Sequence, residues 1–302
     1  MAFLKTHVRL LATASLAAAV LATSPAAAET IVGLTTQGGL VLFDSATPGT
    51  VSAPVAVTGL GAGETLLGID RRPATGQLFG ISSASRLYTL DTITGAATAV
   101  GAPGAFTLSG TSFGFDFNPT VDRIRVTSNT GQNLRLNPNT GALAATDTPL
   151  AYQAGDANAG TAPSVVGSAY TNNFSGAAST QLFDIDANLD ILALQVNPNA
   201  GLLQTVGPLG INAGSLTGFD ISGPSGIAYL VTEANTAPFS NLYRVNLGTG
   251  AASLVGTVGG GLALVDIAAL AGVPEPGTWA TMLAGFGLLG WAARRRRALA
   301  SA

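Results

Sequence analysis

The feature that most constrains the fold of this chain is an internal repeat of about 50 residues. Each copy opens with a short apolar strand that carries a marker residue, and the markers are Asp70, Asp116, Ala169, Asp220 and Asp266. Their spacings are 46, 53, 51 and 46 residues. A unit of this length with four short strands is typical of one blade of a β-propeller. The sequence therefore predicts an all-β fold.

The number of blades follows from how the repeat begins and ends. The fifth copy has one strand, over 262–270, and three further strands over 30–36, 39–44 and 51–58 open the body instead. We expect five four-stranded blades in a single propeller, with the ring closed by pairing of the last strand with the N-terminal strands, which removes exposed sheet edges. Six blades is the alternative, because the stretch 147–163, which reads as a long loop, could hold additional strands.

The first 28 residues have the three parts of a secretion signal. Lys5 and Arg9 precede an apolar stretch over 10–21, and small residues at Ala26 and Ala28 suit the signal peptidase. We expect cleavage after Ala28, which leaves residues 29–272 as the propeller domain.

The other end of the chain, residues 273–297, has an equally ordered composition. An apolar stretch over 279–293 would form a helix of about 22 Å, which is short against a hydrocarbon core of about 30 Å. The basic cluster after it would stay in the cytoplasm, and residues 298–302 form a short tail. The motif residues are Pro274, Glu275, Pro276, Trp279 and Ala280, and the basic residues are Arg294, Arg295, Arg296 and Arg297.

This C-terminal segment resembles a PEP-CTERM sorting signal in its Pro-Glu-Pro-x-x-Trp-Ala form. The resemblance implies a Gram-negative bacterium that makes exopolysaccharide, and an exosortase-type enzyme that cuts near the Pro-Glu-Pro. It also implies a transient membrane tether through a short transmembrane helix, followed by release to the cell surface or the extracellular matrix. An ordinary short membrane anchor is the alternative.

The repeats themselves resemble a bacterial family of propeller-like domains known only as domain of unknown function 4394. The resemblance covers roughly residues 30–270, and its most distinctive phrase is Gly114-Phe115-Asp116-Phe117-Asn118-Pro119, followed by Asp122-Arg123-Ile124-Arg125-Val126. That family carries no established activity, so the resemblance implies a fold and no catalytic residues.

Composition excludes several classes of function. Between Glu29 and Val273 there is no His, Cys or Lys, which removes Ser-His-Asp and Cys-His catalysis, Schiff-base chemistry and His/Cys metal sites. The same stretch has seven basic and fifteen acidic residues, a formal balance of −8, which argues against nucleic acid as a partner. We expect a protein that is not an enzyme and needs no cofactor.

Carboxylate chemistry remains open. Asp70, Asp116, Asp220 and Asp266 occupy equivalent places on inner strands, where they could ring one mouth of the propeller and face a sugar, or could cap a repeated turn. Calcium is a weaker possibility at a loop with alternating oxygen-bearing residues, which lacks the sixth-position glycine and distal glutamate of an EF-hand. The residues of that loop are Asp184, Asp186, Asn188 and Asp190.

Two other groups of side chains have alternative interpretations. Arg123 and Arg125 share one strand face, with Arg135 on the next strand, so they could form a salt-bridge face or a patch that binds sugars or carboxylates. The aromatic residues Tyr88, Phe183 and Tyr243 recur at one blade position, which favours packing between blades.

These patterns lead to one leading hypothesis and two rivals. We expect a non-enzymatic, exported propeller that serves as a binding or structural component linked to exopolysaccharide. The first rival is a carboxylate-based glycoside hydrolase or lyase that acts on extracellular polysaccharide. The second is a surface scaffold stabilised by calcium.

Overall fold

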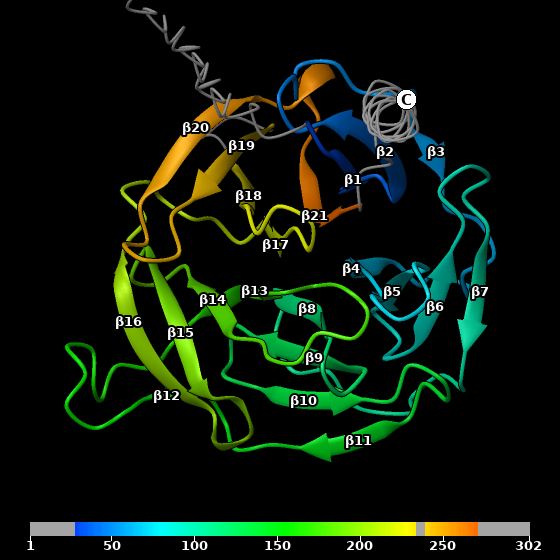
Figure 1. The fold of residues 1–302 in the computed structure, drawn as a ribbon. Coiled ribbons are helices and arrows are strands. Elements are labelled where there is room, and N and C mark those ends of the chain that lie inside the picture. The colour runs from blue at the N-terminus through cyan, green and yellow to red at the C-terminus, as the bar shows by residue number, and fades with distance from the viewer. Residues whose placement is uncertain (1–27, 234–238, 271–302) are drawn as a thin grey trace, which may run out of the picture.

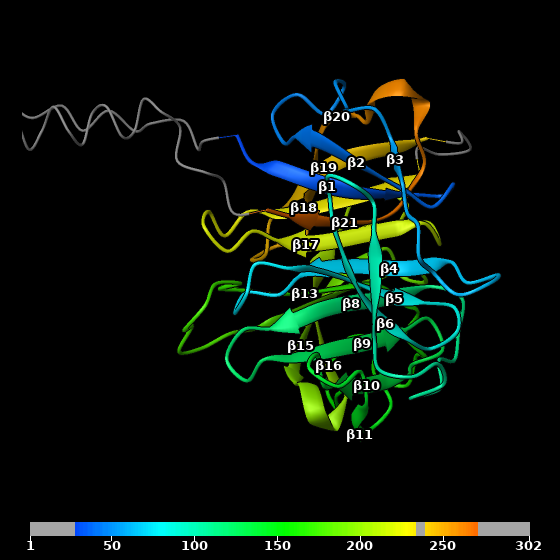
Figure 2. The ribbon, with the colours of Figure 1, turned by 90° about the vertical axis from the view of Figure 1, so that its right-hand side faces the viewer.

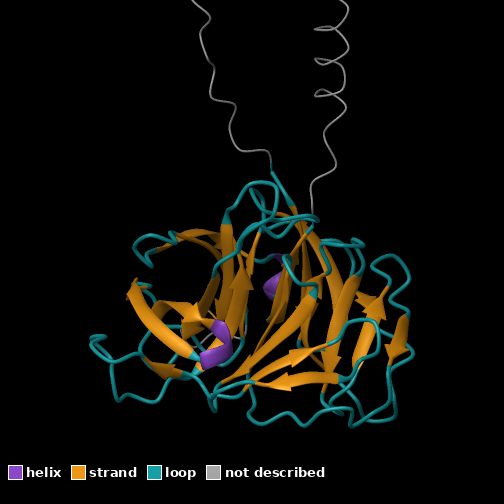
Figure 3. Ribbon diagram, turned by 60° about the horizontal axis from the view of Figure 1, so that its bottom comes forward, coloured by secondary structure: helices purple, strands orange, loops and turns teal. Residues whose placement is uncertain are grey.

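Short strands joined by tight turns build five antiparallel sheets that stand around a common axis (Figure 1). The computed structural model describes residues 28–233 and 239–270. Within these residues, helix is confined to two single 3-10 turns, η1 (Pro198–Ala200) and η2 (Gly259–Gly261) (Figure 3). The prediction of a five-bladed, all-β propeller is therefore confirmed, and the six-bladed alternative is wrong.

Each blade consists of four strands that run from the axis outward. Blade 1 contains β4 (Leu66–Arg71), β5 (Leu78–Ser82), β6 (Leu87–Leu90) and β7 (Ala97–Val100). Blade 2 contains β8 (Phe113–Asn118), β9 (Arg123–Ser128), β10 (Asn133–Leu136) and β11 (Leu143–Thr146). Blade 3 contains β13 (Val165–Tyr170), β14 (Leu182–Asp186), β15 (Ile191–Asn197) and β16 (Leu202–Pro208). Blade 4 contains β17 (Thr217–Ile221), β18 (Ala228–Glu233), β19 (Ser240–Val245) and β20 (Ala252–Thr257).

Blade 5 joins the two ends of the ring, as the sequence predicts. Its strands are β21 (Leu264–Ala269), β1 (Thr30–Thr35), β2 (Gly39–Asp44) and β3 (Val55–Ala56). The inner strand β21 pairs antiparallel with β1, with Ile31 opposite Ala269 and Leu34 opposite Asp266. The stretch 147–163 contributes only β12 (Ala151–Tyr152), which adds a fifth strand to blade 3 by parallel pairing with β16.

The turn before the outermost strand shows why the repeat keeps its glycine. In blade 2 the side chain of Asn137 accepts a hydrogen bond from the backbone N–H of Asn139 at 2.9 Å, and Gly141 closes the turn on the carbonyl of Asn137 at 2.8 Å. Gly141 has φ of +71°, and a side chain there would collide with the carbonyl of Val100 in blade 1. Glycine is required both for the left-handed backbone and for the contact between blades.

Apolar cores lie mainly between neighbouring blades. Separate clusters join blades 1 and 2, blades 3 and 4, blades 4 and 5, and blades 5 and 1. The predicted aromatic residues belong to these interfaces: Tyr88 and Phe183 are buried in them, and the partly buried Tyr243 packs against the cluster of blades 3 and 4. Burial of this apolar surface holds the ring together without disulfides.

The interface between blades 2 and 3 is different, because polar side chains build it. The buried guanidinium of Arg125 in blade 2 donates to the hydroxyl of Tyr170 in blade 3 at 3.3 Å and to the side chain of Asn199 at 3.0 Å. It also pairs with Asp147 at 2.6 Å. Deeper in the same interface, the hydroxyls of Thr127 and Ser168 lie 2.6 Å apart.

Both ends of the described ring lie on one face of the propeller. Ile31, near the start of β1, pairs with Ala269, near the end of β21, so the chain enters and leaves on the same side (Figure 2). Nearly all of the predicted secretion signal, and the whole of the predicted sorting segment at 273–297, lie outside the described residues. In the part of the chain that the structure describes, no helix is long and apolar enough to cross a membrane.

Candidate functional site

The four repeated aspartates lie on the inner strands, close to the axis of the ring. Asp70, Asp116, Asp220 and Asp266, called here the axial aspartates, are each at least 94% buried, with exposed fractions between 1 and 6%. In blade 3 the equivalent position is Ala169 on β13, which has no carboxylate. Their burial separates them from bulk solvent, where a polysaccharide would approach.

Each axial aspartate bonds to the backbone of the next blade. Asp70 accepts from the N–H of Phe117 at 2.8 Å, and Asp116 accepts from the N–H of Tyr170 at 3.0 Å. Asp220 accepts from Ala269 at 2.5 Å, and Asp266 accepts from Ile69 at 2.9 Å, which links blade 5 to blade 1. The repeated aspartate therefore joins neighbouring inner strands.

Glycine two positions before the marker allows the inner strands to approach this closely. A Cβ atom on Gly218 would lie 2.6 Å from the Cα of Asp266, and one on Gly68 would lie 2.9 Å from the Cβ of Phe115. Backbone atoms cannot move aside as a flexible side chain can, so a larger residue at Gly218 would push blades 4 and 5 apart.

Crowding and burial change the acidity of the axial aspartates. Burial, together with the charge of nearby carboxylates, raises the pKa values of Asp70, Asp116 and Asp266 well above the ordinary value. Burial also raises the pKa of Asp220, to about 6, although hydrogen bonds from the amides of Ala269 and Ile221 oppose the shift. These shifts favour the protonated, uncharged form near the axis.

The structure permits one tight group of oxygen ligands in its described part. Carboxylate oxygens of Asp70, Asp116 and Asp220 lie within 4.8 Å of one another, a spacing that a cation could bridge. The same oxygens also serve backbone amides, as described above, so a cation would share them with the contacts between blades.

The predicted calcium loop has its side chains committed elsewhere. Asp184 accepts from the hydroxyl of Ser168 at 2.5 Å, and Asp186 accepts from the hydroxyl of Tyr152 at 2.7 Å. Asp190 accepts from the backbone N–H of Ala213 at 2.8 Å, and Asp186 also closes the turn through the N–H of Asn188 at 2.9 Å. Within 28–233 and 239–270 these four residues do not come together as a set of metal ligands.

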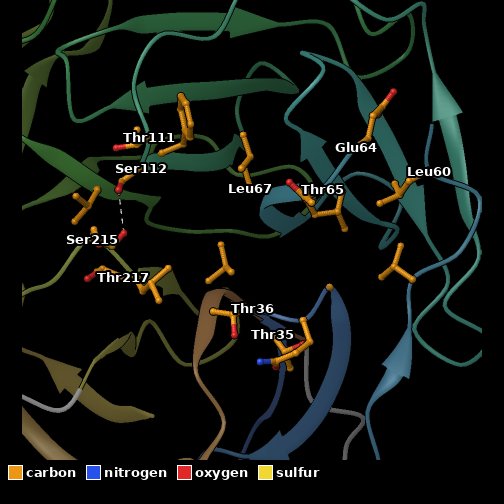
Figure 4. Close-up of a pocket in the computed structure, with 18 residues that line it drawn as sticks. Thr35, Thr36, Leu60, Glu64, Thr65, Leu67, Thr111, Ser112, Ser215 and Thr217 are labelled. Carbon is orange, nitrogen blue, oxygen red and sulfur yellow. Dashed lines mark hydrogen bonds between the residues drawn. The ribbon is translucent and has the colours of Figure 1, made fainter. Parts of the chain in front are cut away.

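A pocket of about 480 Å³ opens where the inner strands begin, and we call it the mouth pocket (Figure 4). Thr35 at the end of β1 and Val265 near the start of β21 both line it, so it lies on the face opposite to the chain ends. Its lining consists of the segments 35–38, 64–67, 111–113 and 215–217 together with Val57, Leu60, Val166 and Val265.

Hydroxyl groups dominate the polar part of the mouth pocket. Thr36, Thr65 and Thr111 present hydroxyls around it, and the hydroxyl of Ser112 donates to the carbonyl of Ser215 at 3.0 Å, which ties blade 2 to blade 4 (Figure 4). The single titratable residue in the lining is Glu64, whose carboxylate accepts from the hydroxyl of Tyr88 at 2.8 Å.

The sequence analysis did not find this pocket. Its hydroxyls come from four short segments that are far apart in the chain, and none of them forms a motif. The Ser and Thr residues that precede the inner strands, such as Thr65, Thr111 and Thr217, were the available signal.

Comparison with protein families accounts for most of the chain. Residues 39–268 match a family described as a domain of unknown function, DUF4394. The chain belongs to this family. The match spans the five blades, so the resemblance inferred from the repeats is confirmed.

A second match identifies the C-terminal segment. Residues 272–297 match the PEP-CTERM protein-sorting motif, which confirms the resemblance drawn from the Pro-Glu-Pro segment. The motif indicates an exported protein that is sorted to the cell surface and processed by an exosortase-type enzyme.

Solved structures share the propeller architecture at low sequence identity. Hydrazine synthase from Kuenenia stuttgartiensis is 8% identical, with a TM-score of 0.38 over 64% of this chain and 49% of that one. TolB from Acinetobacter baumannii is 14% identical, with a TM-score of 0.42 over 76% of this chain and 53% of that one. An auxiliary nutrient binding protein from Bacteroides ovatus is 13% identical, with a TM-score of 0.40 over 66% and 55%. This chain spans about half the length of these proteins, and no curated protein matches it significantly.

Proposed function

We propose that this chain is an exported, cofactor-free binding protein that holds a neutral segment of extracellular polysaccharide in the mouth pocket. Export and surface sorting follow from the PEP-CTERM motif. The extracellular matrix of a Gram-negative, exopolysaccharide-producing bacterium is the location that fits this motif. The observation that carries the proposal is a hydroxyl-lined pocket at the mouth of the ring with one carboxylate among its lining residues.

The chemistry of the mouth pocket suits sugars. Hydroxyls and backbone groups exchange hydrogen bonds with sugar hydroxyls, and the apolar residues Leu67, Phe113 and Val265 offer surface to the faces of sugar rings. A volume of about 480 Å³ lies within the range of ~300–1,000 Å³ that is common for small-ligand sites.

The composition of the same pocket supports binding without hydrolysis. Glycoside hydrolases need two carboxyl groups about 5 to 9.5 Å apart on either side of the scissile bond. Glu64 stands alone among the lining residues, and the axial aspartates are buried and bonded to backbone amides. A glycoside hydrolase or lyase is therefore the weaker proposal.

The proposal predicts that hydroxyl deletion in the mouth pocket weakens binding. Thr36 and Thr65 are exposed in the lining, and their hydroxyls bond to no described residue, so Thr36→Val and Thr65→Val together leave the fold intact. The double variant should bind neutral oligosaccharides from the producer's exopolysaccharide roughly tenfold more weakly, since each hydrogen bond contributes about 1 kcal/mol. Isothermal titration calorimetry measures the difference.

The control is Thr98→Val on the outer strand β7, away from the pocket. It should bind as the unaltered chain does. Equal binding by the double variant, or no binding by the unaltered chain, would contradict the assignment of the pocket. Turnover of the oligosaccharide, abolished by Asp116→Asn or Asp220→Asn, would contradict the non-enzymatic part and establish a hydrolase or lyase.

A further inference from the structure

Three of the seven arginines in the acidic body line one pocket, on the face opposite to the mouth pocket. This arginine pocket has a volume of about 240 Å³ and lies between blades 2 and 3. Arg123, Arg125 and Arg135 line it together with Asn118 and Asn199, and no carboxylate belongs to its lining. Asn118 ends β8, whereas Phe113 at the other end of that strand lines the mouth pocket, which fixes the two pockets on opposite faces.

The three guanidinium groups differ in how far they are already occupied. Arg125 is 2% exposed and bonds to Tyr170, Asn133, Asn199 and Asp147, so it forms part of the wall. Arg135 makes a bidentate pair with Asp147 through Nε at 2.7 Å and Nη2 at 2.8 Å. One carboxylate thus balances two arginines.

Arg123 is the group left for a ligand. In the described residues its one hydrogen bond runs from Nη1 to the backbone carbonyl of Asp122 at 2.9 Å, and it makes no ion pair there. The carboxylate of Asp122 is engaged by Arg72 of blade 1, with Nε to Oδ1 at 2.8 Å. Nε and Nη2 of Arg123 are therefore available, and the pocket holds an excess of positive charge within an acidic ring.

A second hollow of about 450 Å³ adjoins the arginine pocket, and we call it the side groove. The two share Asn118, Tyr170 and Pro198, so they are continuous. Hydroxyl and amide side chains of Thr120, Ser179 and Gln195 line the side groove. Gln195 is 2% exposed, and its side-chain oxygen accepts no hydrogen bond in the described part of the chain. A ligand hydroxyl would supply that donor after a small side-chain movement, which removes the cost of a buried unpaired acceptor.

We propose that the arginine pocket binds the carboxylate of a uronic acid unit in an acidic polysaccharide, with the neighbouring sugar in the side groove. The planar fork of a guanidinium matches a planar carboxylate with two parallel hydrogen bonds. The small volume of the pocket suits one sugar unit, and the hydroxyl-rich groove beside it suits the next. This site is separate from the mouth pocket, and the inference holds whether or not the mouth pocket binds a sugar.

The test is calorimetric titration of the full chain, in mild detergent, with a trimer of galacturonic acid. We expect binding by the unaltered chain and binding at least about tenfold weaker in Arg123→Gln, because hydrogen bonds between charged groups contribute more than neutral ones. Arg244→Gln removes the same charge from an exposed position on β19 and should bind as the unaltered chain does. The methyl ester of the trimer, which has lost its charge, should not bind.

Four outcomes would overturn the inference. They are absence of binding by the unaltered chain, equal affinity of Arg123→Gln, equal affinity for the methyl ester, and binding of inorganic phosphate in place of the trimer. Matching thermal unfolding curves for Arg123→Gln and the unaltered chain exclude loss of the fold as the cause of weak binding.

Discussion

Glu29, the first residue after the expected cleavage site, is buried in the ring and connects blade 5 to blade 4. Its side chain is 4% exposed and accepts hydrogen bonds from the hydroxyls of Ser222 at 2.5 Å, Tyr229 at 2.8 Å and Ser225 at 3.1 Å. Its backbone N–H donates to the hydroxyl of Ser45 at 3.0 Å. The start of the exported chain is thus a structural element of the propeller.

We predict that Glu29→Ala lowers the free energy of unfolding by about 2–4 kcal/mol, because it leaves buried hydroxyls without their acceptor. Urea unfolding followed by circular dichroism measures the change. Glu29→Gln keeps one acceptor oxygen and should cost less. An unfolding midpoint for Glu29→Ala equal to that of the unaltered chain would show that these hydrogen bonds contribute nothing to stability.

At the scale of the elements, buried carboxyls near the axis link stability to pH. Burial raises the pKa of Asp220 on β17 to about 6 and that of Asp184 on β14 to about 7, against about 3.9 in an unfolded chain. Between these values the folded chain holds protons that the unfolded chain has released. Because the folded state binds more protons, the free energy of unfolding falls as pH rises from about 4 to about 7.

We predict a higher melting temperature at pH 5 than at pH 8, with a difference in unfolding free energy on the order of 3 kcal/mol. Asp147 acts in the opposite sense below pH 4: burial would raise its pKa, but hydrogen bonds and charge from Arg135 and Arg125 lower it overall. Its contribution is lost as pH falls through the lowered value. Calorimetric scans from pH 3 to pH 9 measure both slopes, and Asp184→Asn should flatten the upper one. A melting temperature that rises between pH 5 and pH 8 would refute the buried-proton account.

The repeat predicts the blades well because each blade is a local unit. Alternating strands and glycine turns such as Thr94-Gly95 recur at a fixed spacing, and the odd strands at the two ends predict closure. The environment of the axial aspartates is harder to predict, since it depends on how narrow the ring is. Glycines such as Gly218 set that width, and their effect appears only when five inner strands are placed together.

Contacts between blades were also beyond the sequence pattern. Arg125 and Arg135 share a face region as predicted, but their partner is Asp147, which lies in the long loop that leads to blade 3. The mouth pocket likewise combines segments from several blades. A repeat pattern describes each blade well, whereas sites form where different blades meet, and spacing along the chain carries little information about such meetings.

At the scale of the whole molecule, closure of the ring and processing of the tail are separable. β21 ends at Ala269 and pairs along its length with β1, and Asp266 on it bonds to the backbone of Ile69 in blade 1. The Pro-Glu-Pro segment begins only at Pro274. Both ends of the ring lie on the face opposite to the mouth pocket, so a cut near that segment leaves the pocket and every described strand in place.

We therefore predict that a chain ending at Val273 keeps the melting temperature of the full chain within about 2 °C and resists proteolysis equally well. A chain ending at Val258 loses the inner strand of blade 5, exposes the apolar surface that Leu264 and Ile267 cover, and leaves β1 with an open edge. It should lose cooperative unfolding and be degraded rapidly, as limited proteolysis and differential scanning calorimetry would show. A stable, protease-resistant chain ending at Val258 would contradict closure through β21, and an unstable chain ending at Val273 would show that the sorting segment supports the fold.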